Sequence, residues 1–358
     1  MFFSGPYRPR TFDAVAGVSP PVSLVWFVLP AVARPRCAPE KASMIQRLLI
    51  VVDPQAPEAV AAALSWGLAV AQARNAEVLL CSALPACTMP LVDVPLAATM
   101  SPDEFDREVR GASQQPLARA QHQAAEVGVM SQTLVAAAED RVRGLLDAAE
   151  RRRCQLIVVG TDGNNAIMRL LTGSVIPGLM TASRLPLLIV SHARPGVAAA
   201  ALRLHRILVA VEDRDAASTA VDVAVALARE HGAELVFARP FVDDWLPALD
   251  ASAIAGVSAG PLNQALQQRA SQRLDSALAV ARQAALTARG LVLHSGPAGQ
   301  TLAALADTAA CDLIVAAHEG HNALLQLLSG SLLPGLVTAA AVPVLVCRDR
   351  DRAGAAAG

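Results

Sequence analysis

The chain has 358 residues, of which 54% are hydrophobic and only 3% aromatic, and its formal net charge is −1. This length is typical of two domains rather than one. The balanced charge excludes the basic excess that binding to a nucleic-acid backbone requires. The longest strongly apolar segment, at 20–33, contains prolines and is shorter than the ~20 residues of a membrane-spanning helix. We therefore expect neither nucleic acid nor a membrane as a partner.

Residues 1–43 form a proline-rich extension without clear periodicity. Arg8 and Arg10 precede its apolar part, which is compatible with a secretory signal. We favour a second interpretation, in which the protein starts at Met44 and the preceding residues are disordered or translated upstream sequence. The reason is that "MIQRLLIVVD" begins a strand at once, as a compact domain would.

Strands and helices are expected to alternate through the rest of the chain. The first strand, at 47–52, is a continuous apolar run, which indicates burial on both faces. It is followed by helix 57–74, strand 77–83, helix 101–127, strand 132–137, helix 139–151, strand 156–160, helix 173–183 and strand 186–191. A second set has strands at 206–211, 234–239, 290–294, 312–317 and 343–348, with helices at 215–231, 262–288, 298–309 and 330–340. This alternation predicts parallel strands with helices on both faces.

The two sets are copies of one another. Residues 154–190 align without a gap on 311–347, at an offset of 157, and 18 of the 37 positions are identical. Each copy has the size of a domain rather than of a solenoid repeat. We therefore predict an α/β fold of two tandem doubly wound, Rossmann-like domains with five parallel strands each. Their expected bounds are 44–192 and 204–350, with a linker at 193–203 and a flexible tail at 351–358.

A glycine-rich segment follows the fourth strand of the first copy, where doubly wound sheets bind their ligands. Gly160, Gly163 and Gly173 recur at fixed intervals, and Ser174 follows the last of them. Glycines let the backbone approach a ligand closely, and a helix that begins at this point favours an anion at its amino end. The loop contains no lysine and is not a Walker A motif. It suits a chain of phosphates, although ordinary turns and helix caps would also explain the glycines.

This spacing, G-x2-G-x9-G-S, resembles the nucleotide-binding signature of the universal stress protein family. Asp53 at the end of the first strand and the proline before each last strand fit the same resemblance. The family implies a protein that binds ATP or AMP, with or without Mg²⁺. It also implies a role in stress survival and no conventional enzymatic reaction.

The resemblance implies a role for each matching residue of the first copy. The Asp53 carboxylate would contact the ribose, and the backbone of Ser82 would contact the adenine. The other matching residues would line the nucleotide or hold its phosphates: Val159, Gly160, Asp162, Gly163, Gly173, Ser174 and Val175. Asp53 taken alone is also compatible with a simple turn residue.

The second copy departs from the pattern at three positions, one of which is Arg239, where the first copy has Ser82. Ala317 stands where the first copy has its first glycine, and Glu212 replaces the aspartate. A methyl group and an extra methylene would narrow the site, so nucleotide binding by this copy stays open. The rest of the signature is retained, in Gly320, Gly330 and Ser331.

No metal centre or catalytic constellation is expected. The six cysteines form no CxxC pair, which indicates reduced thiols in a cytoplasmic protein. His318 and His321 are three residues apart, whereas the zinc-binding helix motif needs two histidines four apart. We interpret these histidines as polar loop residues, with a phosphate contact as the alternative.

The sequence thus predicts a cytoplasmic, nucleotide-dependent stress-response or regulatory protein with an unknown protein partner. The two copies are expected to pack as an internal pseudo-dimer through their apolar last strands, and two such chains could form a homodimer. One alternative is a weak ATPase or phosphotransferase acting in the same pocket, for which phosphate release abolished by Asp162→Ala would be the sign. The other is a structural or partner-binding module without nucleotide, which would show no thermal shift with ATP.

Overall fold

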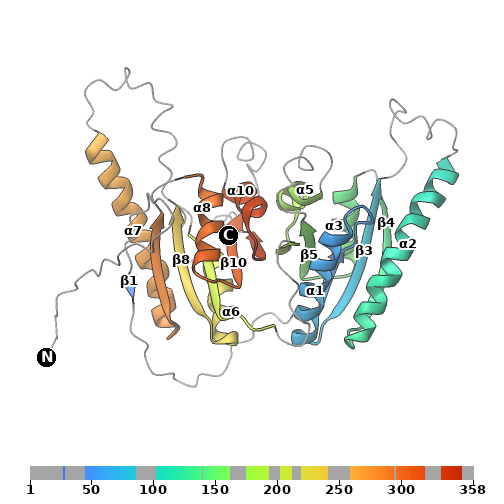
Figure 1. Ribbon diagram of the computed structural model, residues 1–358, viewed down its shortest axis with the longest axis horizontal. Coiled ribbons are helices and arrows are strands. Elements are labelled where there is room, and N and C mark those ends of the chain that lie inside the picture. The colour runs from blue at the N-terminus through green and yellow to red at the C-terminus, as the bar shows by residue number, and fades with distance from the viewer. Residues whose placement is uncertain are drawn as a thin grey trace, which may run out of the picture.

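In the computed structural model, strands and helices alternate in the order expected from the repeat (Figure 1). The structure describes residues 27–28, 45–85, 102–138, 140–161, 175–192, 202–211, 219–240, 259–293, 296–318 and 332–348. The first half comprises β2 (Arg47–Val51), α1 (Pro57–Arg74), β3 (Glu77–Pro85), α2 (Pro102–Glu126), β4 (Ser131–Ala138), α3 (Arg141–Arg151), β5 (Leu156–Thr161), α5 (Val175–Ala182) and β6 (Leu187–Ser191). The second half comprises β7 (Arg206–Ala210), α6 (Thr219–His231), β8 (Glu234–Pro240), α7 (Ala259–Gln283), β9 (Ala288–Leu293), α8 (Ala298–Thr308), β10 (Leu313–His318), α10 (Leu332–Ala339) and β11 (Val344–Arg348).

One continuous sheet runs through both halves, in the order β1-β9-β8-β7-β10-β11-β6-β5-β2-β3-β4. The five strands of each half are parallel, and the first lies beside the fourth, which is the switch point of a doubly wound sheet. The last strands, β6 and β11, join the halves antiparallel, with Val344 opposite Ile189 and Val346 opposite Leu187. The predicted fold and the predicted pseudo-dimer are therefore confirmed.

A short strand, β1 (Phe27–Val28), pairs antiparallel with β9 and extends the sheet at its far edge. It belongs to the 1–43 extension, and the other residues of that extension lie outside the described part of the chain. The domain bounds, the start at Met44 included, stay predictions.

Two sets of helices cover the sheet, and each set closes one hydrophobic cluster that spans both halves. The first cluster contains side chains of α1, α2, α6 and α7, and the second contains side chains of α3, α5, α8 and α10. Leu48, Leu49 and Ile50 of β2 are all 0% exposed, because neighbouring strand residues point to opposite faces and both faces are covered. Each such side chain contributes about 1.5–3 kcal/mol by leaving water.

Most helices end in a left-handed residue at the same place in each copy. Gly128 ends α2 with φ 72°, and Ala285, 157 residues later, ends α7 with φ 54°. The expected helix at 262–288 therefore stops at Gln283, and the strand expected from 290 begins at Ala288. The sequence did not predict this helix end, because a left-handed residue is expected at glycine and not at alanine.

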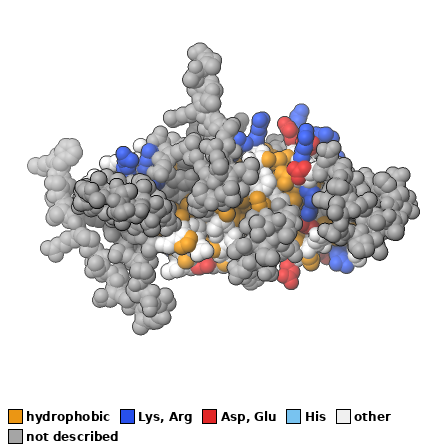
Figure 2. Space-filling view, turned by 90° about the horizontal axis from the view of Figure 1, so that it is seen from above, with side chains coloured by type: hydrophobic (Ala, Val, Ile, Leu, Met, Phe, Trp, Pro, Cys, Tyr) orange, Lys and Arg blue, Asp and Glu red, His pale blue; other side chains and the backbone are white. Residues whose placement is uncertain are grey.

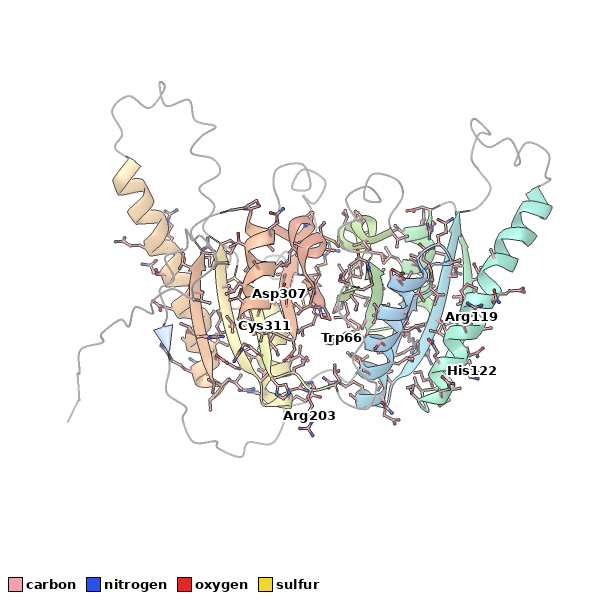
Figure 3. The ribbon with its side chains drawn as sticks, viewed as in Figure 1. Trp66, Arg119, His122, Arg203, Asp307 and Cys311 are labelled. Atoms are coloured by element: carbon pink, nitrogen blue, oxygen red, sulfur yellow. The ribbon has the colours of Figure 1, made fainter. Side chains whose placement is uncertain are left out.

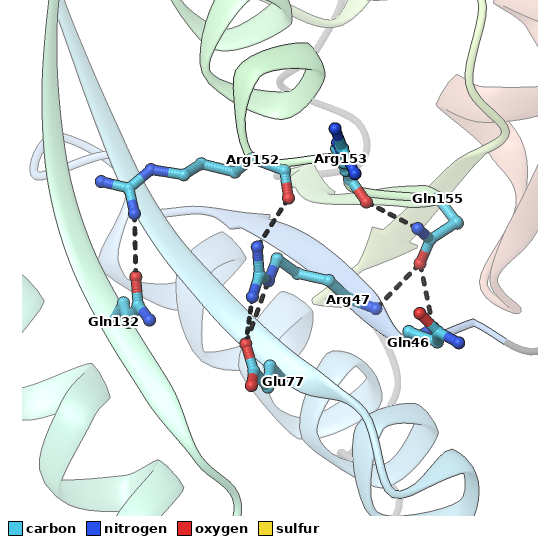
Figure 4. Close-up of polar contacts among 7 residues, drawn as sticks. All are labelled: Gln46, Arg47, Glu77, Gln132, Arg152, Arg153 and Gln155. Atoms are coloured by element: carbon cyan, nitrogen blue, oxygen red, sulfur yellow. Dashed lines mark hydrogen bonds and ion pairs between the residues drawn. The ribbon is translucent and has the colours of Figure 1, made fainter.

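A polar network ties the strands together at the amino end of the first half (Figure 4). Arg47 of β2 pairs with Glu77 of β3, and its Nη1 donates to the Arg152 carbonyl at 2.8 Å. The Gln155 side chain accepts from the backbone N–H groups of Gln46 and Arg47, at 2.9 and 2.8 Å. Arg206, Glu234 and Asp312 repeat the network in the second half. Both networks lie at the amino ends of the strands, whereas a ligand is expected at the carboxyl ends. We therefore assign these contacts a structural role.

Candidate functional site

The candidate site lies at the carboxyl edge of the first half, uppermost in Figure 1. Asp53 follows β2 there, and the Val52 N–H donates to the Cys81 carbonyl at 2.8 Å, which holds this segment beside β3. Helix α5 begins at Val175 at the same edge. The sheet thus brings the aspartate to the edge where the helix that follows the glycine loop begins.

The Asp53 carboxylate is held from two sides. Its Oδ1 accepts from the Gln55 backbone N–H at 3.0 Å, and its Oδ2 accepts from Arg141 Nη2 at 3.0 Å. The Asp53 carbonyl accepts from the Ala56 N–H, which forms the turn into α1. Both side chains remain partly accessible, 26% for Asp53 and 25% for Arg141. A ligand at this edge would therefore find a carboxylate of fixed orientation.

Arg141 is a site residue that sequence reasoning missed. It is the first residue of α3, and its Nε donates to the Ala83 carbonyl at 3.1 Å, so the guanidinium spans the carboxyl ends of β2 and β3. A helix amino end disfavours a cation, and Asp140 already caps this one by accepting from the Val142 N–H at 3.0 Å. An arginine at the first position of a helix is unfavourable for that helix. This unfavourable placement is the sequence signal that could have identified Arg141 as a site residue.

Ser82 is fully buried, with its Oγ 3.0 Å from the Oγ of Ser113 on α2. Its side chain therefore faces the helix layer. In the sheet Ser82 is paired with Val135 of β4. Only its backbone could contribute to a site, as the resemblance implies, and the carbonyl of the next residue, Ala83, already accepts from Arg141.

Val159 and Gly160 lie within β5 rather than in a turn. The Val159 side chain is 3% exposed and belongs to the second hydrophobic cluster. A Cβ added to Gly160 would lie 1.9 Å from the carbonyl oxygen of Ala59 in the first turn of α1. Close packing between α1 and β5 therefore accounts for this glycine without any ligand. Val175, the first residue of α5, is also buried.

The remaining residues of the signature lie outside the described part of the chain. In the first half these are Asp162, Gly163, Gly173 and Ser174, and in the second half Gly320, Gly330 and Ser331. The structure describes what flanks them: β5 ends at Thr161, β10 ends at His318, and α5 and α10 begin at Val175 and Leu332. Each glycine segment thus joins a strand end to a helix start, as the signature requires.

One further polar residue lies at this edge. His192 follows β6, and its backbone N–H donates to the Thr161 carbonyl at 3.2 Å. Its Nε2 lies 3.7 Å from the Glu58 carboxylate of α1. Seen from above, onto this edge, the described surface shows basic and acidic side chains close together, with apolar side chains beside them (Figure 2).

Other chemically interesting side chains lie elsewhere. His122 is exposed on α2, 3.4 Å from Glu126, and Trp66 of α1 is buried (Figure 3). Among the described residues, no three His, Cys, Asp or Glu side chains gather closely enough to hold a metal ion. The described helices likewise include none that is long and apolar enough to cross a membrane.

Four cysteines are free thiols buried in the core: Cys81, Cys154, Cys311 and Cys347. Burial raises the pKa of the Cys81 and Cys347 thiols to about 12, and the pKa of Cys154 and Cys311 to about 11. The neutral thiol is therefore strongly favoured at neutral pH. These residues act as small apolar side chains and offer no nucleophile.

Comparison with protein families places the fold. The model of the universal stress protein family matches residues 44–191 and again 203–348. The chain therefore belongs to the universal stress protein family, as a member with two tandem domains. A search of curated proteins found no match.

Two of the similar solved structures share the fold over most of both chains. A universal stress protein from Archaeoglobus fulgidus DSM 4304 is similar over 85% of this chain and 97% of its own, at 17% identity and a TM-score of 0.61. A putative universal stress protein from Pseudomonas aeruginosa UCBPP-PA14 covers 86% and 94%, at 15% identity and a TM-score of 0.52. A universal stress protein in complex with cAMP covers 41% of this chain and 99% of its own, at 21% identity and a TM-score of 0.32.

Proposed function

We propose that the first domain binds ATP or AMP and that the protein acts as a nucleotide-dependent regulator of the stress response in the cytoplasm. The observation that carries the proposal is the position of Asp53. Its partly exposed carboxylate lies beside the switch point of the sheet, at the edge where α5 begins after Gly173 and Ser174. A carboxylate suits ribose hydroxyls, and a helix amino end suits phosphate.

Family membership supports the choice of ligand, since the family includes a protein solved in complex with cAMP. The mechanism is conformational. The phosphates bind the amides of the segment between Thr161 and Val175, and the nucleotide acts as a switch only to the extent that it binds one conformation more tightly than another. A protein partner then reads the favoured conformation.

The second domain is assigned a mainly structural role. A Cβ added to Gly299 of α8 would lie 2.3 Å from the Leu336 backbone nitrogen of α10, so the two helices are in backbone contact. In the first half, Val142 occupies the position of Gly299 and faces Gly178 of α5 through its side chain. The helix that follows the second glycine loop is thus packed differently from α5. This difference, together with Glu212 in place of the aspartate, favours divergence of the second site.

Mass analysis of the nucleotide retained by the purified full-length protein tests the proposal. We expect ATP or AMP in the wild-type protein, and its loss in the double variant Gly173→Val/Ser174→Ala, which covers the phosphate-binding amides and removes a hydroxyl donor. A wild-type protein that neither retains nor binds nucleotide would refute the assignment. The Asp162→Ala variant, assayed for phosphate release, separates binding from slow hydrolysis.

A further inference from the structure

Arg141, which pairs with Asp53, is not part of the family signature. The guanidinium binds two acceptors on neighbouring strands, the Asp53 Oδ2 at 3.0 Å and the Ala83 carbonyl at 3.1 Å. These two contacts fix its position at the carboxyl edge of β2 and β3. The second copy has Ala298 at the aligned position, so this arginine belongs to the first domain alone.

The Asp53 carboxylate has acceptor sites that its own contacts do not use. An ionised carboxylate offers about four lone-pair sites on two oxygens. Among the described residues, the Gln55 N–H takes one site on Oδ1 and Arg141 takes one on Oδ2. Within the described part of the chain, one site then remains on each oxygen. Two acceptor sites on adjacent oxygens match the two neighbouring hydroxyls of a ribose, each of which donates one hydrogen bond.

We infer that Arg141 is a positioning residue that holds the Asp53 carboxylate for recognition of the 2′,3′-diol of a ribonucleotide. The inference rests on the proposed function, because it assigns a selectivity to the same site. Arg141 itself need not contact the nucleotide. Its effect is to fix the rotation of the carboxylate, so that the ligand does not have to order that side chain on binding.

Isothermal titration of the full-length protein with AMP and with 2′,3′-dideoxy-AMP tests this inference. The wild-type protein should bind AMP roughly tenfold more tightly, because hydrogen bonds to a charged acceptor are lost with the hydroxyls. In Arg141→Ala the ratio should fall to within about threefold, through weaker binding of AMP and nearly unchanged binding of the dideoxy form. Arg141→Met, which keeps the apolar stem, should behave alike, and Arg141→Lys should restore part of the ratio.

Two further variants make the result specific. Asp53→Asn should also lose the discrimination, and Arg143→Ala, an exposed arginine two residues along the same helix, should retain it. The inference is overturned if Arg141→Ala and Arg141→Met weaken the binding of both nucleotides equally or leave both affinities unchanged. It is also overturned if these variants bind AMP more tightly, which would mean that Arg141 competes with the ribose for Asp53. Absence of any saturable binding by the wild-type protein would instead refute the proposed function, and this inference with it.

Discussion

Arg74 at the end of α1 and Glu230 near the end of α6 form an ion pair between the two halves, with Nη2 and Oε2 2.6 Å apart. The pair exists once, because the aligned positions in the opposite copies are His231 and Ala73. The halves are therefore joined symmetrically by the β6–β11 pairing and asymmetrically by this contact. The two copies therefore differ at the junction as well as in their glycine segments.

This ion pair should contribute modestly to stability. Both side chains are partly exposed, 21% for Arg74 and 39% for Glu230, so solvent and salt screen the attraction. In a double-mutant cycle of Arg74→Ala and Glu230→Ala, we expect a coupling of about 0.5 kcal/mol in the free energy of unfolding. The coupling should shrink in 1 M NaCl. A coupling indistinguishable from zero at low salt would mean that the pair plays no part in joining the halves.

Close packing at Gly160 gives a second prediction. Because an added Cβ would meet the Ala59 carbonyl at 1.9 Å, Gly160→Ala must push α1 away from β5. We expect a loss of about 2–3 kcal/mol in the free energy of unfolding, measured by urea titration. Gly111→Ala on the exposed face of α2 is the matched control, since an added Cβ there meets nothing within 4 Å. It should be neutral or stabilising by up to about 1 kcal/mol.

The helix ends allow a reciprocal exchange between the copies. Gly128→Ala places alanine in a left-handed conformation and should cost about 1 kcal/mol. Ala285→Gly relieves the same strain in the other copy and should gain about 0.5–1 kcal/mol, after the entropic cost of glycine. Thermal unfolding of both variants checks the signs. Effects of equal sign would contradict the left-handed geometry at one of the two positions.

The buried thiols predict a loss of stability at alkaline pH. Their folded pKa values, about 11–12, lie above the ordinary thiol pKa of 9.0, so the folded state keeps protons that the unfolded chain releases. The stabilisation is complete below pH 9 and is lost above it, by about 1.4 kcal/mol per pH unit for each thiol. Few other groups titrate in this range, because Lys41 and Tyr7 are the only lysine and the only tyrosine of the chain.

The repeat supplies conservative replacements for two of these thiols. Ala238 and Val190 stand at the positions that align with Cys81 and Cys347, and both are buried. Between pH 8 and pH 10, the variant Cys81→Ala/Cys347→Val should lose about 2–3 kcal/mol less of its free energy of unfolding than the wild-type protein. An identical pH dependence in the two proteins would show that burial does not raise the pKa of these thiols in the folded state.

The sequence predicted the fold well because two independent patterns agreed. The alternation of apolar strands with helices indicated the layers, and the internal repeat gave the order of the elements twice. The end of α7 was not predicted, because Ala285 adopts a left-handed conformation that a sequence indicates only when the residue is glycine or asparagine. The prediction of helix ends therefore depended on residue type, whereas the prediction of the layers depended on periodicity.

The candidate site was predicted less completely, for physical reasons. Asp53 could be placed because a strand end has a fixed position in a parallel sheet. Its partner Arg141 lies 88 residues away, and no local pattern links two side chains at that separation. Gly160 was interpreted as an approach point for a ligand, whereas contact with Ala59 is sufficient to exclude a side chain there. Tertiary contacts of this kind are invisible to periodicity and motif spacing.

If the two domains differ as proposed, each chain binds one nucleotide, in the first domain. Isothermal titration of the full-length protein with ATP and with AMP measures this directly. We predict a stoichiometry near one, abolished by Gly173→Val/Ser174→Ala and retained in the matched second-half variant Gly330→Val/Ser331→Ala. Absence of saturable binding, or binding that only the second-half variant abolishes, would contradict it.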